Sequence, residues 1–190
     1  MHYNLLFNGC SYTEGCELQG IENDIEYQNK TRFSHLVAEH FGMTYQNISK
    51  SGSSNDWITE KTIEWFNAGN TCDLAIIQFT TANRTIFYDE NNKNKEYSFT
   101  PVLSVNGKKL YPEHISLKCS LYYKTFYSDF LGYQNFYKNV FILENFFKMK
   151  NINFIFMTMK SILILNEHKN KYQRNWGTFC NTEDIKNIRE

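Results

Sequence analysis

The stretch that decides the fold is Cys72-Asp73-Leu74-Ala75-Ile76-Ile77-Gln78-Phe79, a run of mainly apolar residues. Such a run is typical of a strand that is buried on both faces of a parallel sheet. Shorter apolar runs predict three further strands, at Tyr3 to Phe7, Met43 to Ile48 and Asn153 to Met159. Helical patterns separate these runs, so strand and helix alternate along the chain.

Apolar residues at helical spacing predict helices over Arg32 to Phe41, Asp56 to Phe66 and Phe136 to Met149. Ser54 or Asn55 is the expected N-cap of the second helix. The alternation of elements predicts an α/β fold, a flavodoxin-like three-layer sandwich with a mostly parallel central sheet of four to five strands.

Length and charge favour a single domain without a charged partner. The 190 residues fit one domain, and 20 Lys and Arg side chains balance 20 Asp and Glu side chains. We therefore expect neither nucleic acid nor a membrane as a partner. The apolar segment Leu5 to Phe7 is too short for the core of an export signal, and no segment has the length of a membrane span. A cytoplasmic location is the resulting expectation.

Metal-binding patterns are not evident in the sequence. Five scattered cysteines without a Cys-x-x-Cys pair fit a reducing compartment and do not favour zinc: Cys10, Cys16, Cys72, Cys119 and Cys180. His35 and His40 are separated by about 140° around a helix axis, so they cannot chelate one ion together. We expect no metal and no organic cofactor.

A long excursion, from about residue 85 to residue 124, separates the third strand from the last predicted helix. Within it, Asn106-Gly107 predicts a two-residue hairpin turn. The expected organisation is one domain over residues 1–190, in which this insertion forms a lid or a wall of a binding site. Several tyrosines there could stack on sugar faces, although core packing explains them equally well: Tyr88, Tyr97, Tyr111, Tyr122 and Tyr123.

The segment Phe7-Asn8-Gly9-Cys10-Ser11-Tyr12-Thr13-Glu14-Gly15 places a serine in a glycine-flanked turn between the first strand and a helix. Open α/β sheets bind ligands beyond the carboxyl ends of their strands, so Ser11 is expected at the edge that holds the site. Gly9 would permit the tight turn, and Gly15 the close packing of the helix. The alternative interpretation is that Ser11 or Thr13 only caps that helix.

In their order along the chain, these blocks resemble the SGNH (GDSL-type) hydrolase family. Gly9-Cys10-Ser11 matches the Gly-Asp-Ser block of the family, with cysteine in place of aspartate, and the Ser-x-Thr-x-Gly continuation is present. The resemblance implies that Ser11 is a nucleophile whose own N–H also helps to hold the oxyanion. In the second block, Asn47-Ile48-Ser49-Lys50-Ser51-Gly52-Ser53-Ser54-Asn55, it implies that Gly52 is another oxyanion donor. The alternative for Gly52 is an ordinary turn glycine.

The third block of the family, Gly-x-Asn-Asp, is not present. Instead the third strand runs into Thr80-Thr81-Ala82-Asn83-Arg84, where Thr81 or Asn83 could supply a side-chain donor to the oxyanion. Arg84 is either a residue that holds an anionic group of the substrate or an ordinary loop arginine.

The fourth block, a C-terminal Asp-x-x-His that carries the general base, is also missing. A serine hydroxyl needs a base, and the candidate bases are His114, in the insertion, and His168. Three explanations stay open: the C-terminal part is truncated, the base comes from elsewhere, or the protein is not a competent hydrolase.

The resemblance implies a serine esterase, or a related acyltransferase, that acts on a small O-acyl or O-acetyl substrate such as an acylated carbohydrate. The alternative is a noncatalytic module that binds carbohydrate or a protein partner, which the altered third and missing fourth blocks favour.

Overall fold

The computed structural model describes residues 1–18, 24–90, 92, 95–101, 104–105 and 108–158. Its centre is a four-stranded sheet with the order β2-β1-β3-β8, in which every neighbouring pair is parallel. The strands are β1 (His2–Asn8), β2 (Tyr45–Asn47), β3 (Thr71–Phe79) and β8 (Asn153–Thr158). The predicted α/β, flavodoxin-like fold with a central parallel sheet is confirmed.

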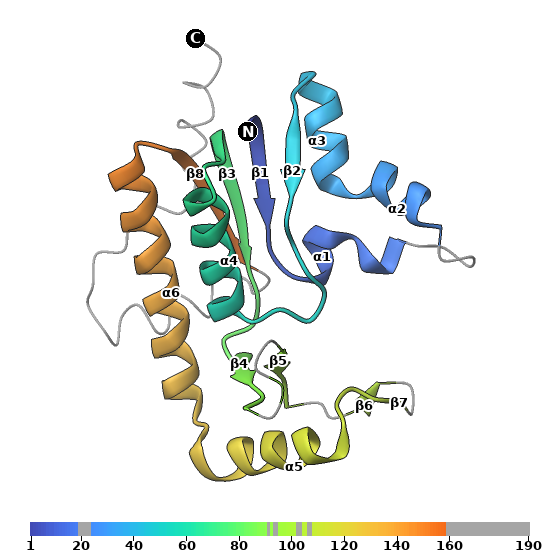
Figure 1. Ribbon diagram of the computed structural model, residues 1–190, viewed down its shortest axis with the longest axis vertical. Helices are drawn as coiled ribbons and strands as arrows, with labels where there is room; N and C mark the ends of the chain where they lie inside the picture. The colour runs from blue at the N-terminus through green and yellow to red at the C-terminus, as the bar shows by residue number, and fades with distance from the viewer. Residues whose placement is uncertain (19–23, 91, 93–94, 102–103, 106–107, 159–190) are drawn as a thin grey trace.

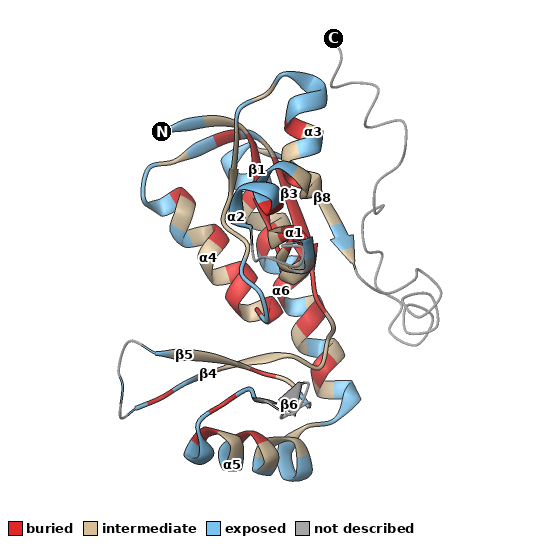
Figure 2. Cartoon of the chain, turned by 90° about the vertical axis from the view of Figure 1, so that its right-hand side faces the viewer, coloured by how far each residue is buried: buried red, intermediate tan, exposed pale blue. Residues whose placement is uncertain are grey.

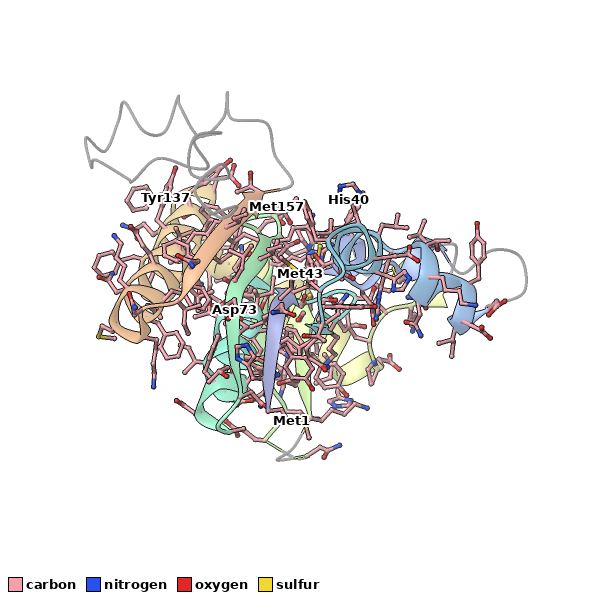
Figure 3. The ribbon with its side chains drawn as sticks, turned by 90° about the horizontal axis from the view of Figure 1, so that it is seen from above. Met1, His40, Met43, Asp73, Tyr137 and Met157 are labelled. Atoms are coloured by element: carbon pink, nitrogen blue, oxygen red, sulfur yellow. The ribbon has the colours of Figure 1, made fainter. Side chains whose placement is uncertain are left out.

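Helices cover both faces of the sheet (Figure 1). One face carries α3 (Phe33–Phe41), and the other carries α4 (Asn55–Asn67) and α6 (Asp129–Lys150). Seen from above, the strands lie between α6, which carries Tyr137, and α3, which carries His40 (Figure 3). Short helices connect β1 to α3, namely α1 (Ser11–Glu14), a 3-10 turn at Cys16–Leu18 and α2 (Ile25–Thr31).

The two faces of the central strands are both apolar. Leu6, Ile77 and Phe79 belong to the larger core cluster, together with side chains of α4 and α6. Phe7 and Ile76 point the opposite way and belong to the cluster under α3. Burial on both faces explains why β3 is a nearly continuous apolar run, and Figure 2 shows this strand as mainly buried.

The insertion lies beyond the carboxyl edge of the sheet (Figures 1 and 2). Its elements are an antiparallel pair, β4 (Thr85–Tyr88) and β5 (Glu96–Phe99), a second antiparallel pair, β6 (Ser104–Val105) and β7 (Lys108–Lys109), then α5 (Glu113–Leu121) and a π-helical turn at Tyr122–Phe126. The pairing of β6 with β7 agrees with the predicted hairpin, whose turn, Asn106-Gly107, lies outside the described residues.

Helices α6 and α2 differ from the prediction because polar caps extend or stabilise them, and α5 was not predicted either. Helix α6 begins at Asp129 rather than at Phe136, since Ser128 Oγ accepts the Leu131 N–H at 3.2 Å. The sequence patterns did not predict α2, which Asp24 caps by accepting two backbone N–H groups.

Gly9 has a role that differs from the one predicted, whereas the close packing predicted for Gly15 is found. Gly15 adopts φ +79° at the end of α1, and a Cβ there would lie 2.8 Å from the Cβ of Arg32. Gly9 is not left-handed, but a Cβ on it would lie 2.3 Å from Thr13 Oγ1 and 3.0 Å from the Cβ of Gln78. Gly9 is therefore required for close packing rather than for a special backbone conformation.

Gly9→Ala should lower the free energy of unfolding by about 1–3 kcal/mol, because the added methyl group overpacks a closed site. Gly42→Ala is the comparison, since Gly42 has φ +64° and open space around it, so its cost of about 1–2 kcal/mol comes from the backbone alone. Urea denaturation measures the free energy of unfolding of both variants and of the double variant Gly9→Ala with Thr13→Ala, in which the clash with Thr13 is removed. If Thr13→Ala restores no stability to Gly9→Ala, the clash with Thr13 is not the reason that Gly9→Ala is destabilised.

Candidate functional site

The carboxyl ends of β1, β2 and β3 lie at one edge of the sheet, and each leads into a loop that carries predicted site residues (Figure 1). The chain after β1 continues to the helices on one face, whereas the chain after β3 continues through the insertion to α6 on the other. The edge between β1 and β3 is therefore a topological switch point, where open α/β sheets bind ligands.

Ser11 is the first residue of α1 and is half-buried. Its hydroxyl makes no hydrogen bond with any residue that the structure describes. It does not cap the helix, because the N-cap is Cys10, which makes no side-chain capping bond. Thr13 is fully buried and donates its hydroxyl to Gln78 Oε1, so it is not a cap either. The strand–turn–helix arrangement thus leaves the Ser11 hydroxyl uncommitted.

The loop after β2 is held against the turn that carries Ser11. The Gly9 carbonyl accepts two hydrogen bonds, from the Lys50 N–H at 3.2 Å and from the Ser53 hydroxyl at 2.9 Å. The Ser51 N–H donates to Glu14 Oε2 at 2.6 Å. These three contacts fix residues 50–53 beside the β1–α1 turn.

Gly52 lies inside this fixed loop. It is exposed, adopts φ +78°, and precedes Ser53, whose N–H donates to the Lys50 carbonyl at 3.2 Å. A glycine with positive φ at this position is typical of a type II turn. Gly52 is therefore a turn glycine, and the same turn places it next to the segment of Ser11.

In the loop after β3, the side chains of Thr81 and Asn83 form a hydrogen bond with each other. The Thr81 hydroxyl donates to Asn83 Oδ1 at 2.7 Å, and the Tyr123 hydroxyl donates to the Asn83 carbonyl. The Thr81 proton is thus already used, whereas the Asn83 amide nitrogen has no acceptor among the described residues. Of the two predicted side-chain donors, Asn83 is the one that retains free hydrogens.

Asn55 fixes the start of this loop, a role that the sequence did not indicate. The side chain is buried; its Oδ1 accepts the Thr80 N–H at 2.8 Å, and its Nδ2 donates to the carbonyls of Thr80 and Thr81 at 3.3 and 3.4 Å. Ser54, the alternative cap, is the residue that accepts the Trp57 N–H and caps α4.

The structure does not bring His114 to Ser11. His114 Nε2 lies 3.3 Å from Oδ2 of the buried Asp89, and the β4–β5 hairpin lies between α5 and the edge of the sheet in both views (Figures 1 and 2). Because the hairpin separates them, His114 could act on Ser11 only after the insertion rearranged. His168, the other predicted base, lies outside the described residues.

Glu96 of β5 anchors the insertion to the main body. Its Oε1 accepts from the indole N–H of Trp57 and from Lys50 Nζ, the latter at 3.2 Å, and its Oε2 lies 3.9 Å from Lys61 Nζ. Partial burial alone would raise the pKa of Glu96, but these hydrogen bonds and lysine charges outweigh it, and the pKa is lowered. The charged carboxylate is thus the form that this contact stabilises.

The tyrosines of the insertion are mainly used in packing. Tyr97, Tyr122 and Tyr123 pack against a buried cluster that contains Phe99 and Tyr111. Burial raises the pKa of Tyr111 to about 12, so its hydroxyl stays protonated and donates to the Ser98 carbonyl. Of the five tyrosines proposed for sugar stacking, Tyr88 is the most exposed, and its hydroxyl donates a hydrogen bond to Glu60 Oε2.

In the described part of the chain, no group of three or more His, Cys, Asp or Glu side chains could hold a metal ion. Cys16, Cys72 and Cys119 are free thiols, and burial raises the pKa of Cys72 to about 12. None of the described helices combines the length and apolar character needed to cross a membrane.

Asn55→Ala should destabilise the protein by about 2–4 kcal/mol, because it removes the acceptor of the Thr80 N–H and a donor to the carbonyls of Thr80 and Thr81. Asn145→Ala is the control, since the half-buried Asn145 side chain makes one hydrogen bond, to a carbonyl of its own helix, and its cost should be about 0.5 kcal/mol or less. Chemical denaturation measures both. Equal effects would mean that the Asn55 amide does not hold the β3 loop.

Glu96→Gln should cost about 1–2 kcal/mol near neutral pH, because the lysines lose their charged acceptor. A lowered carboxyl pKa stabilises the fold above the ordinary glutamate pKa of about 4.3, and this contribution is lost as the pH falls through the folded pKa. The difference between wild type and Glu96→Gln in urea should therefore shrink from about pH 6 to about pH 3. Glu39→Gln, an exposed change on α3, is the control. If the difference in free energy of unfolding between wild type and Glu96→Gln did not change with pH, the charge of Glu96 would not stabilise the contact between the insertion and the main body.

No family model, curated protein or solved structure matches this chain. Any assignment of function therefore depends on the sequence blocks and on the geometry of the carboxyl edge described above.

Proposed function

We propose that this protein is an SGNH-like serine ester hydrolase, in which Ser11 attacks a small O-acyl or O-acetyl substrate at the carboxyl edge of the sheet. The observation that carries the proposal is the position of Ser11. Its uncommitted hydroxyl follows a buried strand at a topological switch point, on a turn that the loop of Gly52 contacts directly.

In the proposed reaction, Ser11 Oγ adds to the ester carbonyl carbon while its proton passes to a base. The resulting oxyanion would accept hydrogen bonds from the backbone N–H groups of Ser11 and Gly52 and from the side-chain amide of Asn83. The alcohol then leaves with a proton, and water hydrolyses the acyl-enzyme by the same steps. Each oxyanion donor typically contributes a factor of about 10²–10³ to turnover.

The base is the part of the proposal that the described residues do not supply. His114 is engaged with Asp89 behind the β4–β5 hairpin. The other histidine expected from the sequence is His168. A base is needed because a neutral serine hydroxyl is a weak nucleophile.

A second candidate function is ligand binding without turnover. The observation that favours it is that no histidine contacts Ser11 in the part of the chain that the structure describes. A module of this kind would keep the carboxyl edge as a binding surface for an acylated carbohydrate or a protein partner, and Ser11 would then serve as a hydrogen-bonding group.

The test is hydrolysis of p-nitrophenyl acetate by the wild type and by Ser11→Ala, with circular dichroism as a check on folding. The esterase proposal predicts a loss of at least about a thousandfold in kcat for Ser11→Ala and little change for Ser120→Ala, a control on α5. His114→Ala and His168→Ala then identify the base by a comparable loss. Background rates from folded wild-type protein would reject the esterase and favour the binding module.

A further inference from the structure

We infer that Arg84 selects substrates with an anionic oxygen group, such as a carboxylate, close to the acyl ester. This inference rests on the proposed function, because it names the class of substrate for the same site.

The guanidinium of Arg84 reaches the loop that carries Gly52. Arg84 follows Asn83, and its backbone N–H donates to the Thr81 carbonyl at 3.3 Å, which fixes the turn from which the side chain projects. Its Nη1 donates to the Ser53 carbonyl at 3.3 Å.

Ser53 in turn touches the turn of Ser11, since its hydroxyl donates to the Gly9 carbonyl at 2.9 Å. A single residue therefore separates the Arg84 guanidinium from the β1–α1 turn. An anionic group bound by Arg84 would lie on the same substrate as an ester bond at Ser11.

The charge of Arg84 has no counter-ion among the residues that the structure describes. Its one hydrogen bond to a carbonyl uses one of five N–H donors, and its side chain is half-buried. The nearby cations differ in this respect: Lys50 pairs with Glu96, and Lys61 lies 2.9 Å from Glu64.

The carboxylates of this region are also occupied. Glu14 accepts the Ser51 N–H at 2.6 Å, and Asp56 accepts the side-chain amide of Asn139 at 2.9 Å. Neither pairs with Arg84. A partly desolvated guanidinium without a counter-ion is poorly compensated, and a ligand carboxylate or phosphate would supply the missing charge through two parallel hydrogen bonds.

The test compares two esters of one shape, 3-acetoxybenzoate, which is anionic, and 3-acetoxybenzamide, which is neutral. Arg84→Gln should raise KM for the anionic ester by about 10- to 100-fold, the value of a hydrogen-bonded charge, and leave KM for the neutral ester and both kcat values nearly unchanged. Lys124→Gln, which removes an exposed cation of the insertion, should change neither ester. An unchanged KM ratio in Arg84→Gln would overturn the inference.

Binding without turnover separates this inference from the proposed function. Calorimetric titration of Ser11→Ala with 3-acetoxybenzoate should show binding that Arg84→Gln, added to the same variant, weakens to the level of the neutral ester. This result would support the anion site even if Ser11 had no catalytic role. Equal binding of the two esters by Ser11→Ala would overturn it. If Arg84→Gln does not fold, Arg84→Lys replaces it; a point charge cannot form the paired hydrogen bonds, so the same preference should weaken by about tenfold.

Discussion

Buried side-chain amides at the carboxyl edge of the sheet are the constraint on which the site depends. Asn8, at the end of β1, is fully buried and donates to the Ile58 carbonyl at 2.9 Å and to Thr62 Oγ1 at 2.8 Å. Its Oδ1 accepts the Gly9 N–H at 2.8 Å. A buried amide that loses a partner costs about 1–3 kcal/mol, so β1, its turn and α4 satisfy these bonds together in one arrangement.

Hydrogen bonds from asparagine side chains recur at the two neighbouring strands, made by the half-buried Asn47 and the buried Asn55. Asn47, at the end of β2, donates to the Thr13 carbonyl at 2.8 Å and to Ser34 Oγ at 3.0 Å, so it ties β2 to α1 and α3. Asn55 ties α4 to the end of β3. The ends of the three strands that lead to the proposed nucleophile and oxyanion donors are thus anchored by side-chain amides, whose hydrogen bonds are more directional than apolar packing.

The sequence predicted the elements whose pattern is local and not the contacts between distant residues. The apolar run of β3 and the stripe of α4 required no tertiary information, and both were found within a few residues of their predicted bounds. The predicted first strand ended before Asn8, and Asn55 was predicted only as a possible cap, because the hydrogen-bond partners of both side chains lie far along the chain. For the same reason the pairing of His114 with Asp89, on the far side of the β4–β5 hairpin from Ser11, had no signal in the sequence.

The loop of residues 50–54 contacts both the α1 segment, which carries Ser11, and the insertion. On one side Glu14 of α1 holds it through the Ser51 N–H. On the other side the insertion holds it, since Glu96 accepts from Lys50 and the Ser98 hydroxyl accepts the Ser54 N–H at 3.2 Å. The orientation of the Gly52 N–H therefore depends on how the insertion is seated. A substrate that shifts the insertion would also shift the proposed oxyanion donor, Gly52, so the proposed reaction would depend on how the substrate binds.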